Sequence, residues 1–535
     1  MKKIKYLVLL LAVVFNSCED ATNITQDGEV NDAATFTSTG QMKAYLLEAY
    51  DKLEQSSPTN GIAASALLTD EVGIGKGGSV TGDFYKFIVN TTNGYSAAIW
   101  SDNYTTINYC DRLIRGAALV TPVDAADQLV YNDVLAQARA LRAYCHLQLL
   151  TYFSPNMKDD EEIGVIILDH VPTPLESIQR SKNGDVFAFI IADLDYAYAN
   201  IQTNASAKPW TYVSKGMINA VRARMYAYRG MYTQAEQYAT DAIADAGVGI
   251  VDGTSAGVPT NTAGVTAFYT STGAGSPNLY KRMFQDFSQG EMIWSIGRSS
   301  GKSAVGTAFA VNLSASSGVT LYDMNRNLFN LLDNGATSGS NAAGVNTSLV
   351  KDIRRYVDID PSQIVTGGVN GYLTSATYQS TDNLPIDKYS GIAGTGNALI
   401  NDIKAFRVSE MVFIQAEARV AASDLPGAAL LIKSIRDKRY INGAPVLPVY
   451  ANATAAWADI LLERRLELAF EGHRYIDLKR LGALAGGLTA DRHPLDCSTY
   501  SLTECSLPLN DYRFTLPIPT SETDPNPTII QNPNY

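Results

Sequence analysis

The stretch from Ser214 to Asp245 constrains the fold of this chain more than any other part of the sequence. It reads SKGMINAVRARMYAYRGMYTQAEQYATDAIAD, and Gly230 in its middle favours the end of one helix. Thr233 and Glu236 then have the spacing of a capping box that would start a second helix. Small residues on the first helix would let its neighbour approach closely, namely Ala220, Ala223 and Ala227. The stretch therefore predicts two consecutive helices packed as a pair.

Helical periodicity recurs along the rest of the chain. Apolar residues follow a helical repeat at Met42, Tyr45, Leu46, Ala49, Tyr50 and Leu53. Further helices are expected over about 98–119, 126–153, 184–201, 406–422 and 428–440. Together with the pair above they make eight helices, or four pairs that resemble tetratricopeptide helix pairs. Each pair exposes an apolar face that it cannot bury alone, so we expect the pairs to stack into one solenoid-like scaffold.

Two long segments break this pattern. Residues 60–95 and 246–400 are rich in Gly, Ser, Thr and Asn, with scattered aromatic residues and little helical period. They predict long loops with short strands. Because loops usually carry recognition while a rigid scaffold positions them, we expect these two insertions to build a ligand-binding face. The predicted fold class is therefore mainly α, with loop-rich insertions.

The N-terminus predicts export and lipid attachment. Three lysines within the first five residues precede ten apolar or aromatic residues, Tyr6 to Phe15, a run too short to cross a bilayer. The following Ser17-Cys18 is similar to a bacterial lipobox, in which the cysteine thiol receives diacylglycerol. Residues 1–17 would then be a signal peptide and residues 18–40 a lipid-anchored tether. The alternative is an ordinary exported protein with an incidental cysteine.

The formal charge disfavours anionic partners. It is −12 for the whole chain and becomes −15 when the three lysines of the signal are removed. A negative body repels nucleic acid and anionic lipid headgroups, so neither is expected as a partner and a neutral ligand fits better. No other stretch is apolar enough to cross a membrane, so we expect contact with the bilayer through the lipid anchor only.

Four cysteines remain once Cys18 is set aside, an even number for an oxidising compartment. Cys497 and Cys505 would close a short loop, where a disulfide and two free thiols are equal alternatives. Cys110 and Cys145 fall on predicted helices, where buried free thiols are commoner. The histidines lack the spacing of metal ligands, so no zinc site is expected from His146, His170, His473 and His493.

Two motifs near the C-terminus resemble signatures of the SusD/RagB family. The first, ILLERRLELAFEGHRYIDLKRLG at residues 460–482, is similar to the family's helix ER-x2-EL-x2-EG-x-R followed by DL-x-R. Its matching residues are Glu463, Arg464, Glu467, Leu468, Glu471, Gly472, Arg474, Asp477, Leu478 and Arg480. The second, LPIPTSETDPNPTIIQNPNY at residues 516–535, is similar to the family's terminal PIP, acid, NP and QNP pattern before a final tyrosine. His473, between Gly472 and Arg474, occupies a variable position of the first motif, so it does not weaken the match.

The resemblance implies a mainly helical lipoprotein of the outer membrane that faces the extracellular side. Members pair with a SusC-like TonB-dependent transporter and act as a lid over its barrel; most bind oligosaccharide or polysaccharide and some bind peptides. The family has no catalytic machinery, so no enzyme activity is expected. Residues 41–535 would form a single domain. Its expected parts are a helix-pair scaffold (about 41–59, 96–245 and 401–440), the two insertions, and the C-terminal motifs within 460–535.

Glu463, Glu467 and Glu471 lie four residues apart, so their carboxylates would project from one face of a helix. Two carboxyls about 5 to 10 Å apart could serve as the acid pair of a glycoside hydrolase, and this spacing can meet that distance. The competing interpretation is a structural ion-pair network with nearby arginines, in which Arg464 reaches Glu467. We prefer the network. Serine-based catalysis is not expected, because the histidines lack an evident acidic partner.

Sugar binding requires flat aromatic rings against the C–H faces of pyranoses, with amides and carboxylates for the hydroxyls. Tyrosines outnumber phenylalanines 30 to 16, and many of them lie in the two insertions. The candidate ligand-binding residues are Tyr85, Asn93, Tyr95, Tyr322, Tyr372, Tyr378 and Tyr389. The first three precede a helix at a place where SusD-like proteins often hold ligand. Trp100, Trp294 and Trp457 are expected in the core, whereas Trp210 could be a core or a binding residue.

The predicted function is capture of oligosaccharide or polysaccharide outside the cell and transfer of it to the transporter. No cofactor is implied, and binding of a structural calcium ion by the acidic loops stays an open alternative. Three alternatives remain: a peptide receptor of the same fold, a surface glycoside hydrolase, and an assembly protein that docks partners on its helix pairs.

Overall fold

The computed structural model describes residues 32–535 of the chain, apart from internal gaps. The gaps are residues 55–56, 76–83, 174–175, 261–263, 265–266, 269–270, 272, 299–301, 303, 313–318, 334–350, 360–383, 393–396, 442 and 499–503. The signal peptide, Cys18 and most of the tether therefore lie outside the described residues, as do the candidates Tyr372 and Tyr378.

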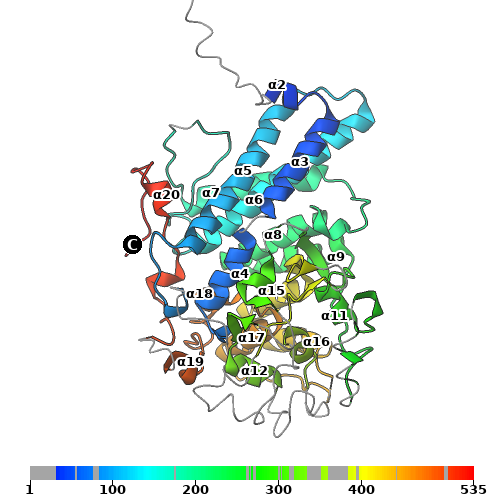
Figure 1. Cartoon of the computed structure of the whole chain (residues 1–535), viewed down its shortest axis with the longest axis vertical. Helices are drawn as coiled ribbons and strands as arrows, with labels where there is room; N and C mark the ends of the chain where they lie inside the picture. The colour runs from blue at the N-terminus through cyan, green and yellow to red at the C-terminus, as the bar shows by residue number, and fades with distance from the viewer. Residues whose placement is uncertain are drawn as a thin grey trace, which may run out of the picture.

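Long helices packed side by side form the upper part of the molecule in Figure 1. They are α3 (Thr39–Leu53), α5 (Gly94–Ala117), α6 (Ala125–Phe153) and α7 (Asn183–Asn200), and each packs on the next. Side chains that accept hydrogen bonds from first-turn N–H groups begin three of them: Ser38 for α3, Asn93 for α5 and Asp124 for α6. All four helices were expected from the periodicity of the sequence.

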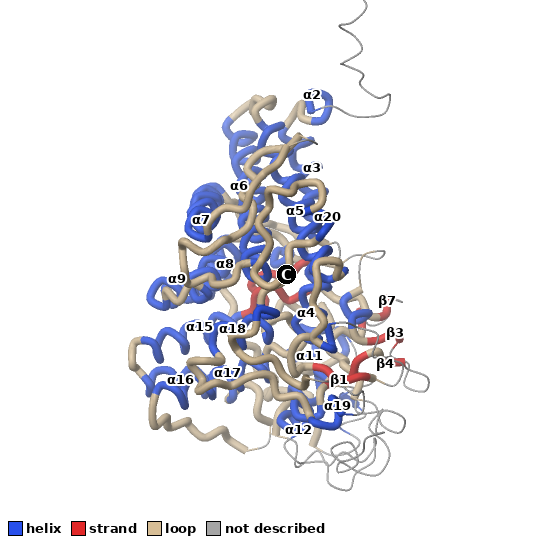
Figure 2. The backbone as a smooth tube through the Cα atoms, turned by 90° about the vertical axis from the view of Figure 1, so that its left-hand side faces the viewer, coloured by secondary structure: helices blue, strands red, loops and turns tan. Residues whose placement is uncertain are grey.

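The helix pair expected around Gly230 is present as α8 (Lys215–Tyr228) and α9 (Tyr232–Ala246). Gly230 follows α8 with a φ of +73°, a left-handed conformation that suits glycine. α15 (Val408–Ala421) packs on α9 and pairs with α16 (Leu425–Arg436). Figure 2 shows α6 and α7, α8 and α9, and α15 and α16 as successive layers. The mainly α scaffold is thus confirmed.

Two local predictions are wrong. Thr233 and Glu236 do not cap α9, which begins without a side-chain cap. Glu236 pairs instead with Arg419 on α15, at 2.7 Å, so a tertiary contact has replaced the local one. Residues 60–67, expected to be irregular, belong to the helix α4 (Ser57–Leu67), which packs against α5. Its small and apolar residues are helical because neighbouring helices bury them.

Short antiparallel strand pairs occur in the insertions, as expected. β1 (Val72–Ile74) pairs with β5 (Tyr322–Met324), with Ile74 opposite Tyr322, so the first insertion is joined to the second. β2 (Met292–Ile296) pairs with β8 (Ile403–Arg407), which leads directly into α15. The other pairs are β3 (Ala310–Asn312) with β4 (Val319–Thr320) and β6 (Gly391–Ile392) with β7 (Asn397–Ala398).

The first C-terminal motif folds as two helices, α17 (Ala453–Glu467) and α18 (Arg474–Leu481). Phe470 and Gly472 between them have φ values of +62° and +84°, and this turn redirects the chain. Glu471 therefore lies beyond the end of α17. The prediction that all three glutamates share one helix face is wrong for this residue.

The second motif, residues 516–535, forms a strap over the end of α6, which we call the C-terminal strap. Asn532 donates its side-chain amide to the carbonyl of Phe153, the last residue of α6, at 3.0 Å. Gln531 exchanges two hydrogen bonds with the backbone of Ile518, at 2.8 and 2.7 Å. These amides satisfy backbone groups that have no strand partner, so the motif has a structural role.

The other short α-helices are α2 (Asp32–Thr35), α11 (Leu279–Phe284), α12 (Arg326–Asp333), α13 (Arg354–Asp358), α19 (Pro494–Ser498) and α20 (Thr520–Thr523). Cys497 on α19 and Cys505 are joined in a disulfide, with their Cα atoms 5.5 Å apart. Cys110 and Cys145 are buried free thiols, as predicted.

One hydrophobic core extends through the helical layers, and Trp100, Trp294 and Trp457 are buried in it as predicted. A smaller second core lies beside it and consists of Val251, Phe268, Tyr280, Met283, Phe284, Met292, Ile353, Tyr356 and Val357. Trp210 is only partly buried and packs at the edge of this second core. Within the described ranges, no helix has the length and apolar character that crossing a membrane requires.

Candidate functional site

The glutamates of the first C-terminal motif were one candidate for chemistry, and the structure places them in an ion-pair network. Glu467 is fully buried and lies 2.8 Å from Arg439, 2.9 Å from Arg407 and 3.2 Å from Arg354. Glu471 lies 2.8 Å from Arg407. These arginines come from β8, α13 and the chain after α16, so the carboxylates hold several elements together.

The pKa values of these carboxyls are those of permanent anions. Burial alone would raise the pKa of Glu467, but Arg439, Arg407 and Arg354 outweigh burial and hold this pKa well below its usual range. The pKa of Glu471 is also lowered, because Arg407 and Lys388 outweigh the effect of burial. A glycoside hydrolase needs one carboxyl with a raised pKa as its general acid. The network interpretation is supported, and neither glutamate is suited to act as that acid.

The predicted contact between Arg464 and Glu467 is absent, because Arg464 has other partners. It lies 2.7 Å from Asp477 on α18 and 3.4 Å from Glu417 on α15. Arg480 contacts the same two carboxylates, at 2.9 and 2.6 Å. The motif's basic residues therefore tie α17 and α18 to the helix pair of α15, and this second cluster is structural as well.

The sequence-predicted residues Tyr95 and Tyr322 come together, although 227 positions separate them in the sequence. Tyr95 lies in the first turn of α5, and its ring centroid is 5.3 Å from that of Phe84. Tyr322 opens β5, and its ring lies 6.2 Å from that of Tyr85. The pairing of β1 with β5 places Tyr322 beside the first insertion. We call Asn93, Tyr95 and Tyr322 the tyrosine site.

The rings of the tyrosine site are half-buried, and their polar ends are available. Burial raises the pKa of Tyr322 to about 12, and the neighbouring Tyr95 adds to the shift. Both phenols are therefore neutral at physiological pH. Asn93 Oδ1 accepts hydrogen bonds from the N–H groups of Tyr95 and Ser96, at 2.9 and 3.4 Å. Among the described residues, neither phenol hydroxyl nor the Asn93 side-chain NH2 has a hydrogen-bond partner, so all three can bind a ligand.

Tyr85 and Tyr389 are corrections to the predicted set. Tyr85 is 0 % exposed, and Arg492 lies over its ring, 4.3 Å from the centroid. Tyr389 is 1 % exposed and donates its hydroxyl to the carbonyl of Phe470 at 2.9 Å. Both rings pack inside because the insertions that carry them fold onto the helices. Neither can present a face to a ligand.

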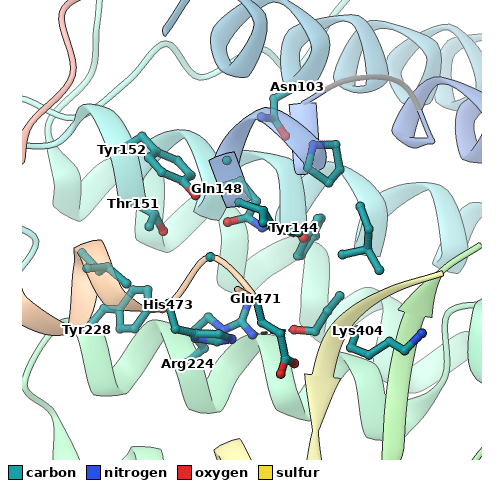
Figure 3. Close-up of a pocket in the computed structure, with 17 residues that line it drawn as sticks. Asn103, Tyr144, Gln148, Thr151, Tyr152, Arg224, Tyr228, Lys404, Glu471 and His473 are labelled. Atoms are coloured by element: carbon teal, nitrogen blue, oxygen red, sulfur yellow. Dashed lines mark hydrogen bonds between the residues drawn. The ribbon is translucent and has the colours of Figure 1, made fainter. Parts of the chain in front are cut away.

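A polar cavity of about 60 Å³ lies between α6, α8 and the turn after α17, and Figure 3 shows its lining. Arg224 on α8 is held there by Glu410, at 2.7 Å. His473 also lines the cavity, and burial lowers its pKa to about 4, so its ring is neutral. Ligand sites usually measure about 300 to 1,000 Å³, whereas this volume suits ordered water. The cavity is therefore a structural feature, and no sequence pattern predicted it.

Metal binding has no support in the described part of the chain. No group of three or more His, Cys, Asp or Glu side chains there is arranged to hold a metal ion. Those loop residues that the structure describes thus contain no ligand set for the calcium ion that the sequence left open.

Comparison with known proteins gives a consistent family signal. A sequence model described as the SusD family matches residues 291–535. The "SusD-like protein P2" of Formosa agariphila is 26% identical over 241 residues, which cover 44% of this chain and 45% of that protein. The match thus spans less than half the length of that relative. The "SusD-like protein P38" of the same organism is 23% identical over 530 residues, covering 92% of this chain and 96% of the relative.

Solved structures agree in fold over nearly the whole chain. A SusD superfamily protein from Bacteroides thetaiotaomicron has a TM-score of 0.69 at 18% identity, covering 93% of this chain and all of that one. A SusD-like carbohydrate binding protein from Bacteroides vulgatus has a TM-score of 0.65 at 17% identity, covering 92% and 98%. At these identities the likeness establishes the fold.

Proposed function

Because this chain belongs to the SusD/RagB family, we propose that it captures oligosaccharide or polysaccharide at the outer surface of the cell. The bound glycan would pass to a partner TonB-dependent transporter of the SusC type. The protein acts by binding and is not an enzyme, in line with its family.

The tyrosine site carries this proposal. Tyr95 in the first turn of α5 and Tyr322 on β5 are half-buried and near enough for Tyr95 to raise the pKa of Tyr322, while Asn93 caps the start of α5. The two phenol hydroxyls and the Asn93 side-chain NH2 have no hydrogen-bond partner in the described residues. Aromatic faces cover the C–H surfaces of pyranoses, while phenol and amide groups bind the hydroxyls. The site has no ionised side chain of its own, which favours a neutral polymer. A solved structure of the same fold is itself named a carbohydrate binding protein.

The proposed location follows from the N-terminus. Residues 1–17 would direct export, the Cys18 thiol would carry the lipid, and residues 18–40 would tether the domain formed by residues 41–535. The domain would then face the extracellular side, with the bilayer contacted through the lipid alone.

Binding of polysaccharides to the purified domain tests the proposal. Affinity electrophoresis through gels containing pullulan, laminarin, arabinoxylan or galactomannan should retard the wild type in at least one gel. Tyr95→Ala and Tyr322→Ala should each weaken that binding roughly tenfold, because each removes one ring from the site. Tyr512→Ala is a matched control, since Tyr512 is a half-exposed tyrosine outside the site.

Two outcomes would contradict the proposal in different ways. Capture of a peptide pool without retardation by any polysaccharide would favour the peptide receptor of the same fold. Full binding by both tyrosine variants would keep the glycan function but remove the tyrosine site from it.

A further inference from the structure

A hollow of about 400 Å³ lies away from the tyrosine site, where the end of α7, the start of α8 and the end of α9 meet. Its volume falls within the range of about 300 to 1,000 Å³ that is usual for ligand sites. The short helix η2 (Pro209–Thr211) forms one wall and carries Trp210. No lining residue is shared with the tyrosine site.

Trp210 has the position expected of a residue that stacks on a ligand. One part of the side chain packs against the second core, which holds the ring in position, while the rest lines the hollow. The other three tryptophans are buried, so Trp210 is the one whose ring reaches a hollow of this size among the described residues. Its indole N–H has no hydrogen-bond partner within them, so it can donate to a ligand.

The charged groups that line the hollow are of both signs, and contacts with neighbouring side chains hold them in place. Asp245 at the end of α9 accepts hydrogen bonds from Asn219 and Tyr198, at 2.8 and 3.2 Å, through one carboxylate oxygen. Its second oxygen has no partner among the described residues. Lys215 at the start of α8 lies over the Tyr198 ring, 4.9 Å from the centroid. One positive and one negative group make the hollow neutral overall.

Amides complete the lining. Gln202 and Asn204 come from the segment between α7 and η2, and Gln289 comes from the segment before β2. Asn204 Oδ1 accepts a hydrogen bond from Ser206 N–H at 2.8 Å, which orients its NH2 group. The hollow thus suits a neutral sugar. The Trp210 ring matches a C–H face, and the amides, the carboxylate and the ammonium group match the hydroxyls.

We propose that this hollow, which we call the Trp210 hollow, is a second binding site for a neutral pyranose unit of a glycan. Trp210 supplies the stacking surface, Asp245 and the amides accept or donate to hydroxyls, and Lys215 balances the carboxylate. The ligand class rests on the proposed function, whereas the site itself rests on its own geometry. Two separated sites would let one long chain bind at both, which raises its apparent affinity.

Site-resolved protection of Trp210 tests this inference. The purified domain is oxidised with N-bromosuccinimide, with and without pullulan, laminarin, arabinoxylan or galactomannan, and the oxidation of each tryptophan is read by peptide mass spectrometry. At least one polysaccharide should slow oxidation of Trp210 and leave buried Trp100 unaffected. The double variant Tyr95→Ala/Tyr322→Ala should keep this protection, because the tyrosine site is separate.

Affinity electrophoresis with Trp210→Ala and Asp245→Ala provides the second readout. Each variant should bind the protecting polysaccharide at least fivefold more weakly, and Trp210→Phe should recover part of the loss because it restores an aromatic ring. Phe287→Ala is the matched control, since Phe287 is an exposed aromatic residue outside both sites. Unchanged thermal unfolding of each variant shows that the fold is retained.

The outcomes separate this inference from the proposed function. Unprotected Trp210, together with wild-type affinity of Trp210→Ala for a polysaccharide that binds the protein, would overturn the Trp210 hollow and leave the proposed function standing. Protection of Trp210 with unchanged binding by the tyrosine variants would support the hollow and move the main site to it. Failure of all four polysaccharides to bind or protect would overturn both.

Discussion

Several buried charges in this protein are paired with opposite charges, and Glu467 is the clearest case. Three arginines from separate elements contact this one carboxylate, and none of the four side chains is more than 1 % exposed. Bringing such charges out of water is costly, so removing one partner leaves the others unpaired. The carboxylate is thus a structural centre of the lower layers.

Replacing Glu467 by Gln should lower the free energy of unfolding by about 3 to 5 kcal/mol, because the arginines lose their shared counter-charge. Urea unfolding monitored by circular dichroism measures this loss. Glu236→Gln is the control, because Glu236 pairs with Arg419 at a partly exposed position, and the substitution should cost less than about 1 kcal/mol. Equal losses for the two variants would contradict the structural role of Glu467.

His146 should make the protein less stable in mild acid. Its Nδ1 lies 2.9 Å from the carbonyl of Arg142, and its Nε2 accepts a hydrogen bond from the N–H of Leu168 at 3.3 Å, so the neutral ring uses both nitrogens. Burial is the main cause that lowers its pKa to about 3. Between that value and the unfolded pKa of about 6.5, the unfolded chain binds one more proton than the folded one. Stability therefore falls as the pH falls through this window, by up to about 1.4 kcal/mol per pH unit.

The measurement is the free energy of unfolding of wild type and His146→Gln between pH 7 and pH 5. The variant should show a shallower loss, since it has no ring to protonate on unfolding. His170→Gln is the control, because hydrogen bonds to Asp169 and Glu176 raise the pKa of exposed His170 and give it the opposite sign. A slope for His146→Gln equal to that of the wild type would rule out this role.

At the scale of elements, the scaffold depends on tight turns between paired helices. α8 and α9 are separated by three residues, and Gly230 supplies the left-handed backbone that reverses the chain. Ser423 has the same role between α15 and α16, with a φ of +63°. Because both pairs turn in so few residues, each second helix returns along the first and exposes one face for the next pair.

Gly230→Ala should destabilise the fold by about 1 to 2 kcal/mol, which is the cost of a left-handed conformation for a residue with a Cβ. The added Cβ would meet only the Lys158 side chain, at 3.7 Å, so backbone strain is the main effect. Gly249→Ala is the matched control, because that position has open space and no positive φ. Thermal unfolding of both variants checks the prediction, and equal midpoints would contradict it.

At the scale of the whole molecule, long-range contacts join the layers into one body. The C-terminal strap returns to the end of α6, and β1 pairs with β5, with Ile74 opposite Tyr322. Asp70 between α4 and β1 also lies 2.8 Å from Arg474 on α18. These contacts support our proposal that the two insertions and the C-terminal motifs belong to one domain with the helices.

Attachment of the whole molecule to the membrane is proposed to depend on Cys18. Cys18→Ala should move the protein from the membrane fraction to the soluble fraction and abolish labelling by radioactive palmitate, because one thiol carries the lipid. Cys110→Ala is the control, since that thiol is buried and should leave both properties unchanged. Membrane retention of Cys18→Ala would contradict the proposal.

The sequence alone was sufficient where the determining forces are local. All eight expected helices are present to within a few residues, because apolar periodicity depends only on neighbours three and four positions apart. Gly230 could be identified as the end of α8 because the preference of glycine for a left-handed backbone is also a local property. The predicted capping box is absent, because α9 begins at Tyr232, before Thr233, and Glu236 pairs with Arg419, which is far away in sequence.

Only the tertiary structure decided which aromatic residues can meet a ligand. Tyr85 and Tyr95 in the first insertion and Tyr322 and Tyr389 in the second were all candidates from the sequence, yet one of each two is buried and the other is half-exposed. Burial depends on segments that pack from hundreds of residues away, as β5 does on β1, and no local pattern encodes it. The sequence by itself determined a stacked helical scaffold with the family's C-terminal motifs. The packing of distant segments decided where its surface is open, at the tyrosine site and the Trp210 hollow.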